Sequence, residues 1–119
     1  MTRTEQVGDL TVQFEDAGGP VIASTDDAMD LIGNASYSGV GLVVLPVERL
    51  DPEFFRLSSG LAGDVLQKFV NYRVRVAIVG DISVHVGASD ALRDFVWESN
   101  RGEHVWFVPH EAALRERLA

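Results

Sequence analysis

Residues 42–53, LVVLPVERLDPE, place a fully apolar run directly before a strong helix start. A continuous run such as residues 42–45 is typical of a parallel strand that is covered on both faces of its sheet. Asp51 suits the cap of a helix whose first residue is Pro52, and Glu53 then meets the positive end of the helix dipole. A buried strand followed by a capped helix predicts one βα unit.

The same order of strand and helix recurs on both sides of this stretch. Further apolar strands are predicted at residues 21–23, 74–79 and 105–108, and capped helices at about residues 24–37, 51–72, 89–100 and 110–118. Strands that alternate with helices pair in parallel through right-handed crossovers. We therefore expect an α/β fold of four consecutive βα units.

The N-terminal residues add a different element. Apolar and polar side chains alternate over residues 10–14, which is the period of a half-buried strand. Gly8 and Asp9 suit a tight turn, so this strand is expected to form a hairpin with the segment around Gln6 and Val7. The expected sheet is therefore mostly parallel, with an antiparallel hairpin at its N-terminal end.

The composition excludes several classes of protein. The 119 residues suit a single domain over residues 1–119, and 10 basic against 18 acidic residues give a net charge of −8. This acidic balance argues against binding to nucleic acid or to an anionic membrane surface, because both require a cationic face. The absence of cysteine suits a reducing cytosol, and residues 1–6 lack the apolar run of a signal peptide. Residues 40–47, the longest apolar stretch, are too few to span a bilayer, so we expect a cytoplasmic protein.

Polar residues follow the predicted strands at the edge of the sheet where α/β proteins bind ligands. Asp26, Glu48, Asp81 and Glu111 could converge there on a cation, or Arg49 and the helix starts on an anion. We retain Glu48, Arg49 and Asp81 as candidate ligand-binding residues. The loop preference of these residue types favours a plainer interpretation, in which the aspartates are turn and cap residues and Glu48 and Arg49 form a surface pair.

Sequence motifs for cofactors and catalysis are absent. His85, His104 and His110 lack the close spacing of zinc ligands. The sequence holds no Walker loop, no Gly-x-Gly-x-x-Gly and no Gly-x-Ser-x-Gly elbow. We therefore expect no metal, no cofactor and no catalytic residue, and we rank an enzymatic role below a binding role.

Residues 58–63, SSGLAG, disturb the long helix predicted over residues 51–72. Each glycine inside a helix costs about 1 kcal/mol relative to alanine, and serine is also a poor helix former. Either the helix restarts at Ser58 or Ser59, with hydroxyls at its positive end, or Gly60 and Gly63 allow a close approach to a neighbour. The first alternative makes Ser58 or Ser59 a candidate acceptor for a phosphoryl group. In the second, a serine cap and packing glycines are purely structural.

Several short motifs carry a resemblance that spans nearly the whole chain. They are RLxPEFF at 49–55, GLAG at 60–63, QKF at 67–69, NYR at 71–73, VGD at 79–81, LRDF at 92–95 and ESNRG at 98–102. With these motifs the chain resembles a small bacterial family known only as a domain of unknown function, family 4180. The resemblance implies no activity.

A second resemblance is to STAS domains, the fold of anti-sigma-factor antagonists. In those domains the sequence Asp-Ser-Ser-Gly-Leu-Gly opens a helix after a strand, and a partner kinase phosphorylates a serine of that motif. Residues 58–61, SSGL, stand at the equivalent place here, and Ser58 matches the usual acceptor. Leu57 replaces the acidic residue before the serines, and the helix start at Asp51 and Pro52 is inserted upstream. The resemblance therefore supports the stacked βα units more than it supports a phosphorylation switch.

These observations leave three hypotheses for the function. A STAS-like binding or regulatory module would contact a protein partner around Ser58, Ser59 and Gly60. A small-ligand protein or enzyme would instead use the polar residues at the carboxyl ends of the strands. The third hypothesis is a structural homodimer within a larger assembly. A deep pocket that encloses both Arg49 and Asp81 would favour the second hypothesis, and a flat or convex surface at Ser58 and Ser59 would favour the first.

The helix predicted at 89–100 carries a hint of self-association. Trp97 points away from the apolar face of this helix and stands beside Arg93 and Arg101, and exposed tryptophans are enriched at interfaces. Right-handed crossovers would also leave one face of the sheet without helices, to be covered by the N-terminal hairpin or by a second subunit. We expect a homodimer with Trp97 as an anchor, against the alternative that Trp97 lies along its own subunit and the hairpin suffices.

Overall fold

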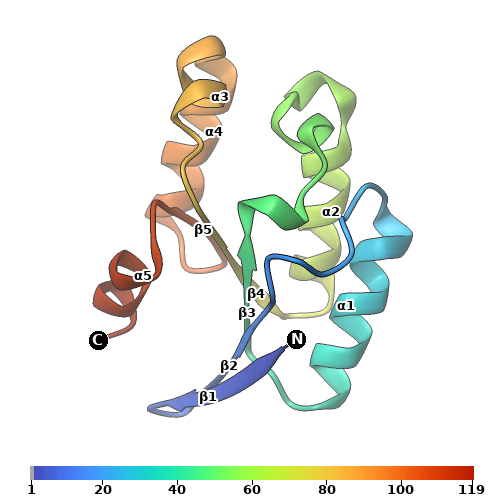
Figure 1. The fold of residues 1–119 in the computed structure, drawn as a ribbon, viewed down its shortest axis with the longest axis vertical. Coiled ribbons are helices and arrows are strands. Elements are labelled where there is room, and N and C mark those ends of the chain that lie inside the picture. Colours follow the sequence, from blue (N-terminus) through green and yellow to red (C-terminus); the bar gives the residue numbers. More distant parts are fainter. Residues whose placement is uncertain (1) are drawn as a thin grey trace.

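The computed structural model describes residues 2–119, which form a five-stranded sheet with helices on both faces (Figure 1). The strands are β1 Arg3–Val7, β2 Leu10–Phe14, β3 Leu42–Pro46, β4 Arg75–Val79 and β5 Val105–Val108. The helices are α1 Thr25–Tyr37, α2 Leu61–Asn71, α3 Ser83–Ala88, α4 Asp90–Arg101 and α5 Glu111–Leu118. Three short 3-10 helices, η1 Val47–Arg49, η2 Pro52–Phe55 and η3 Leu57–Ser59, connect β3 to α2.

The topology confirms the expected α/β fold. The strands lie side by side in chain order; β1 pairs antiparallel with β2, and every later pair is parallel. Four βα units follow one another, and β2 serves both as the second hairpin strand and as the strand of the first unit. The predicted starts of α1 and α4 are confirmed, because the side chains of Ser24 and Ser89 accept hydrogen bonds from the backbone of their first turns.

The strand predicted at residues 21–23 is wrong. Only Ile22 forms a bridge, and its partner is Leu50. The Ile22 N–H donates to the carbonyl of Arg49 at 2.7 Å, and the Asp51 N–H donates to the carbonyl of Ile22 at 3.1 Å. This segment therefore pairs with the chain beyond the end of β3, because β2 already occupies the place beside β3 in the sheet.

The sheet separates two apolar cores. Side chains from α1, α2 and α4 pack on one face, where Ile32, Phe69 and Leu92 are buried with Val43 and Leu45 of β3. The alternate residues of β3, at 42 and 44, belong to the opposite core. This explains why the strand is apolar along its whole length, as the sequence predicts for a strand covered on both sides.

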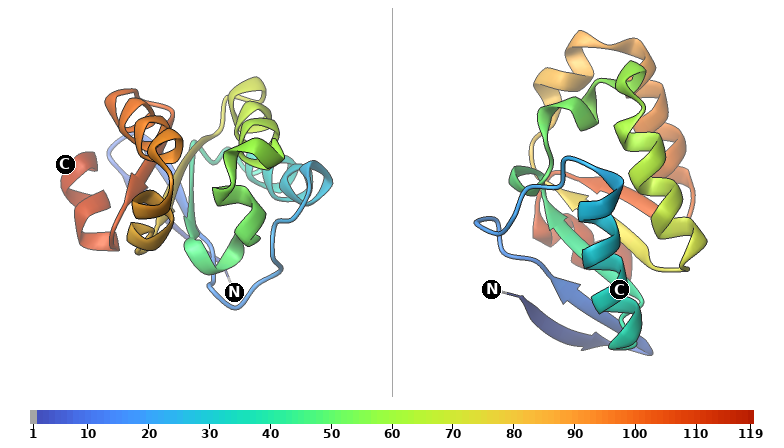
Figure 2. Two further views of the ribbon diagram at one scale, coloured as in Figure 1. Left: turned by 90° about the horizontal axis from the view of Figure 1, so that it is seen from above. Right: turned by 90° about the vertical axis from the view of Figure 1, so that its right-hand side faces the viewer.

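Helix α5 covers the second face of the sheet. Leu114 of α5 is fully buried there with Val12, Phe14 and Trp106. In Figure 2, α4 and α5 lie on opposite sides of β5. The crossover rule does not constrain α5, because no parallel strand follows it. The sequence predicts the hairpin or a second subunit on this face, whereas the C-terminal helix takes much of that role.

Asn100, near the end of α4, closes part of the sheet edge at β5. The carbonyls of His104 and Val108 accept hydrogen bonds from the β4 side, so the alternating Phe107 directs its backbone polar groups away from β4. The Asn100 side chain accepts from the Phe107 N–H at 2.7 Å and donates to the Phe107 carbonyl at 3.1 Å. One amide group thus meets both outward-facing groups of Phe107, as a neighbouring strand would.

Candidate functional site

A groove lies beyond the carboxyl ends of β3 and β4, the edge at which α/β sheets bind ligands. One wall is the η2–η3 segment that follows β3, and the other is the α3–α4 segment that follows β4; both stand at the top of Figure 1. The groove has a volume of about 440 Å³. It therefore lies at the edge of the sheet where the sequence predicts a site.

Aromatic and aliphatic side chains form much of this groove. The rings of Phe55 and His85 stack at 4.5 Å between centroids, with an angle of 14° between their planes. Leu57 also lines the groove, and Val84 stands beside it with 81% of its surface exposed. Covering such an exposed aliphatic side chain with another apolar surface is favourable, because apolar area is then removed from water.

Helix α3, which carries His85, has no counterpart among the helices predicted from the sequence. Residues 83–88 form a short helix. The Asp81 carboxylate accepts a hydrogen bond from the Ser83 N–H at 2.9 Å and fixes the turn into this helix. The signal that could have located it is the Asp-x-Ser pattern, a local turn that aspartate favours.

The segment that follows β3 decides between the two interpretations of the serines and glycines. The helix predicted over residues 51–72 is broken into η2, η3 and α2, and Gly60 between them has a positive φ of 82°. The Ser59 hydroxyl donates to the Glu53 carbonyl at 2.7 Å and accepts from the Leu61 N–H at 3.2 Å. The helix therefore restarts after the serines. A Cβ built on Gly60 or on Gly63 would meet no atom within 4 Å, so the close-approach interpretation is wrong for both residues.

Ser58 is an exposed residue of this segment and lines the groove. Its hydroxyl oxygen accepts a hydrogen bond from Arg56 Nη1 at 3.1 Å. Arg56 also pairs with Glu53, whose carboxylate accepts from Arg56 Nε at 2.8 Å. Ser58, Arg56 and His85 therefore line one groove, so the surface at Ser58 is hollowed and not flat or convex. Of these three residues only Ser58 is a candidate from the sequence.

The three candidate ligand residues do not form one site. Glu48 is exposed, whereas Arg49 is buried with 6% of its surface exposed. Arg49 Nη1 lies 3.0 Å from a carboxylate oxygen of Glu15, and Arg49 Nε donates to the carbonyl of Pro20 at 2.5 Å. The suggested surface pair of Glu48 and Arg49 is therefore wrong. Arg49 and Asp81 also line two different cavities.

Gly19 has no side chain, and this leaves space for the guanidinium of Arg49. A Cβ on Gly19 would lie 2.6 Å from Arg49 Nη1, closer than any side chain tolerates. Arg49 Nη1 also donates to the carbonyl of Asp16 at 3.0 Å. The arginine therefore joins the loop after β2 to the turn after β3, which is a structural role.

The acidic residues suggested for a cation do not converge either. Glu111 lies in α5, on the other face of the sheet from α1, in whose first turn Asp26 stands. Asp81 has a lowered pKa because the Ser83 backbone N–H donates to its carboxylate. Within residues 2–119, no three His, Asp or Glu side chains are close enough to hold a metal ion.

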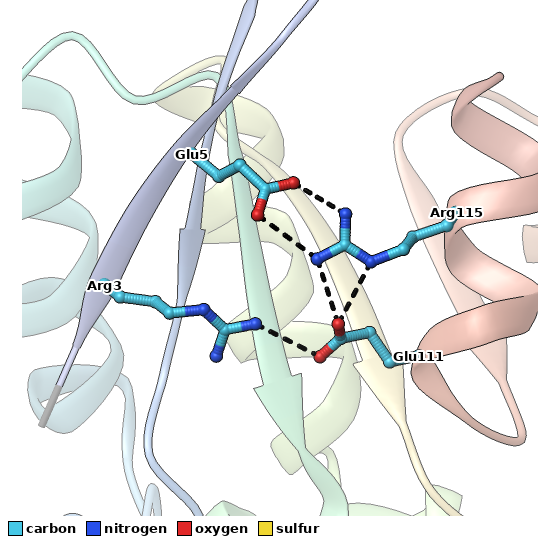
Figure 3. Close-up of polar contacts among 4 residues, drawn as sticks. All are labelled: Arg3, Glu5, Glu111 and Arg115. Atoms are coloured by element: carbon cyan, nitrogen blue, oxygen red, sulfur yellow. Dashed lines mark hydrogen bonds and ion pairs between the residues drawn. The ribbon is translucent and has the colours of Figure 1, made fainter.

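Glu111 belongs instead to an ionic network that joins β1 to α5 (Figure 3). Arg115 contacts Glu5 at 2.6 Å and Glu111 at 3.0 Å, and Arg3 contacts Glu111 at 3.4 Å. The hydrogen bond from Arg115 lowers the pKa of Glu5, and the two carboxylates raise the pKa of Arg115. The guanidinium groups of Arg3 and Arg115 also cover the ring of Phe14, 4.4 and 5.3 Å from its centroid.

Trp97 lies on α4 with 61% of its surface exposed. The guanidinium of Arg101 sits 4.7 Å from the centroid of one of its rings. The exposed position that the sequence predicted is therefore found. Trp97 is not part of the groove, so the residues around Ser58 and the tryptophan are separate surfaces.

Comparisons with known proteins bear on the family and not on an activity. None of the helices described over residues 2–119 has the length and apolar character needed to cross a membrane. No curated protein and no solved structure matches the chain. The family model for the domain of unknown function DUF4180 matches residues 8–118, and the chain therefore belongs to this family.

Proposed function

We propose that the protein is a binding and regulatory module whose protein partner docks in the groove between η2–η3 and α3–α4. The observation that carries this proposal is Val84, an aliphatic side chain that is 81% exposed beside a groove of about 440 Å³. Leu57 and His85 are partly exposed next to it, and the ring of His85 stacks on the buried ring of Phe55. A partner that inserts an aliphatic or aromatic side chain there would cover Val84 and the partly exposed Leu57 and His85, and so remove them from water.

Ser58 supplies the regulatory element of the proposal. It follows β3 and precedes the start of α2, which is the place of the acceptor serine in the STAS domains that the sequence resembles. Its hydroxyl is exposed and lines the same groove. A phosphoryl group there would add about two negative charges at the surface that the partner contacts.

Phosphorylation of Ser58 would also change the contacts of the neighbouring Arg56. Its guanidinium already donates to Ser58 and pairs with Glu53. A phosphate on Ser58 would attract Arg56 more strongly than a neutral hydroxyl does, because hydrogen bonds between ions are about twice as strong as neutral ones. Arg56 would then turn from Glu53 toward the phosphate, and the charge and shape of the groove would change together.

The alternative, a small-ligand protein or enzyme that uses Glu48, Arg49 and Asp81, has less support. The guanidinium of Arg49 donates to Glu15 and to backbone carbonyls, so much of its binding capacity is used within the chain. Arg49 and Asp81 also line different cavities. To act on the same ligand, these residues would have to lie side by side.

The proposal is tested by capturing partners from the host with the wild-type protein and with Val84→Asp. The matched control is Tyr37→Asp, because Tyr37 is 96% exposed and lies outside the groove. We expect one partner to bind the wild type and Tyr37→Asp, and to lose at least tenfold in affinity for Val84→Asp. Circular dichroism should show that all three proteins are folded. A partner that binds Val84→Asp as tightly as the wild type would contradict the proposed groove.

The regulatory element has its own test. Ser58→Asp should stay folded, because the hydroxyl is exposed, and it should weaken or strengthen partner binding by at least fivefold. Ser58→Ala is the control that removes the hydroxyl without adding charge. If Ser58→Asp and Ser58→Ala bind the partner equally, Ser58 is not a switch, and the groove is then judged on Val84→Asp alone.

A further inference from the structure

A second cavity, of about 260 Å³, lies at the carboxyl ends of β4 and β5. It is independent of the proposed partner groove, although α3 contributes to both. Val86 of α3 and Val96 of α4 line it, and Phe107 of β5 and Ile78 of β4 lie behind them. An apolar cavity of about 150 Å³ is already large enough to admit benzene, so this one has room for a single ring or a short branched chain.

One charged residue lines this apolar space. Among the lining residues that the structure describes, Asp81 is the only charged one, and Ser83 is the only other residue with a polar side chain. Ligand sites commonly combine apolar walls with a few polar groups that orient the ligand. A carboxylate as the only charged group selects a ligand that carries a positive charge.

Asp81 is an exposed residue whose carboxylate is ionised and hydrogen-bonded to the backbone of α3. Its carboxylate accepts a hydrogen bond from the Ser83 N–H at 2.9 Å, and this bond lowers its pKa, so it is charged at neutral pH. The carboxylate retains further acceptor sites, because an ionised carboxyl group accepts about four hydrogen bonds. An ammonium group can therefore bind Asp81 without breaking the turn that begins α3.

Gly80 keeps the floor of the cavity in its present shape. Its φ of 147° belongs to the region that favours glycine, and a Cβ there would lie 2.6 Å from a methyl carbon of Val47. The Gly80 N–H donates to the carbonyl of Val108 across the β4–β5 pair. The backbone that leads into Asp81 is thus attached to the sheet beside the cavity.

We propose that this cavity binds a small amphipathic amine, with the ammonium group on Asp81 and a ring or branched alkyl group between Val86, Val96 and Phe107. The probe for this proposal is benzylamine, titrated into the ¹⁵N,¹³C-labelled protein while the methyl signals of Val86 and Val96 are followed. Benzyl alcohol has the same ring without the charge, and benzoate has the opposite charge. A salt concentration of about 0.15 M limits non-specific attraction of the amine to a protein of net charge −8.

We expect benzylamine to give saturable shifts centred on the cavity, and to bind at least tenfold more tightly than benzyl alcohol or benzoate. Asp81→Asn keeps an oxygen that can accept from Ser83 but removes the charge, and it should weaken benzylamine binding at least tenfold. Asp64→Asn, an exposed site in α2, is the control and should leave the affinity unchanged. Val96→Phe should fill the cavity and abolish binding of all three probes.

Three results would overturn the proposal. The first is an equal affinity of wild type and Asp81→Asn for benzylamine, and the second is equal binding of benzylamine and benzyl alcohol. The third is a set of shifts that does not saturate or that follows the acidic surface instead of the cavity. Because Asp81→Asn leaves the apolar walls intact, its result stands even if Val96→Phe is too destabilised to measure.

Discussion

Arg49 is a charged residue that is buried, and it stabilises the fold through contacts inside the protein. Its side chain and that of Glu15 are both more than nine-tenths buried and form one ion pair. Removing one member of such a pair leaves the other charge buried without compensation. The pair therefore makes the loop after β2 and the turn after β3 depend on each other.

We expect Arg49→Met to lower the free energy of unfolding by about 3–5 kcal/mol, as for other broken buried ion pairs. Arg93→Met is the control, because Arg93 forms exposed pairs with Asp90 and Asp94 and should lose at most about 1 kcal/mol. Urea unfolding at neutral pH measures both. A loss of under about 1 kcal/mol for Arg49→Met would show that the pair contributes little.

The two adjacent serines should differ in the same experiment. The Ser59 hydroxyl makes two hydrogen bonds that hold the start of α2, so Ser59→Ala should cost about 1 kcal/mol. The hydroxyl of Ser58 is exposed and accepts from the long, exposed side chain of Arg56, so Ser58→Ala should cost at most about 0.5 kcal/mol. Equal losses in the free energy of unfolding would contradict the interpretation that Ser59 is structural and Ser58 regulatory.

At the scale of elements, the contact between β1 and α5 links the two ends of the described chain. Glu5 has a lowered pKa in the folded protein, so its ionised form stabilises the fold at pH values above its unfolded pKa of about 4.3. That stabilisation is lost as the pH falls through the lower, folded pKa. Arg115 remains charged throughout this range, because its pKa is raised further.

The expected signature is a stability difference between wild type and Glu5→Gln that is full near neutral pH and disappears in acid. Chemical unfolding at a series of pH values measures it. The control is Asp64→Gln, which alters an exposed carboxylate outside this network. A difference that persists unchanged in acid would mean that the charge of Glu5 is not what holds β1 to α5.

The strands and most helices of this fold could be predicted from the sequence, because each has a local signal. Residues 42–45 are apolar throughout since both faces of β3 are covered, and Ser24 and Ser89 mark helix starts by local hydrogen bonds. The strand predicted at residues 21–23 is wrong because three apolar residues in a row do not show which segment they pair with. The pairing of Ile22 with the backbone of Arg49 and Asp51 is a contact between segments far apart in the sequence.

The candidate site was predicted only in part, for a related reason. Ser58 was found because serines and glycines are unusual inside a helix. His85 was missed because its stacking partner, Phe55, is distant in the sequence. The sequence predicts Arg49 as a ligand-binding residue or as a surface partner of Glu48, whereas its partner in space is the distant Glu15. Local patterns thus identified the segment after β3 but not the groove that it forms with α3.

At the scale of the whole molecule, a homodimer remains a prediction, with Trp97 as its anchor. We expect the wild type to sediment as a dimer at micromolar concentration and Trp97→Ala to shift toward the monomer, because exposed tryptophans often contribute most of an interface's energy. Tyr37→Ala is the control, being an exposed aromatic residue on α1. A monomeric wild type would reject the dimer, and a dimeric Trp97→Ala would remove Trp97 from the interface.

The amide of Asn100 has a further effect on how copies of this protein can assemble. Because it occupies the outward-facing groups of Phe107, β5 presents fewer free groups to an incoming strand, while β1 is the other end of the sheet. A sheet that can be joined at one end only forms a pair and then stops, whereas two open ends permit an unlimited fibre. By occupying the Phe107 groups, Asn100 therefore disfavours growth of the sheet at β5 and leaves β1 as the edge more open to strand pairing.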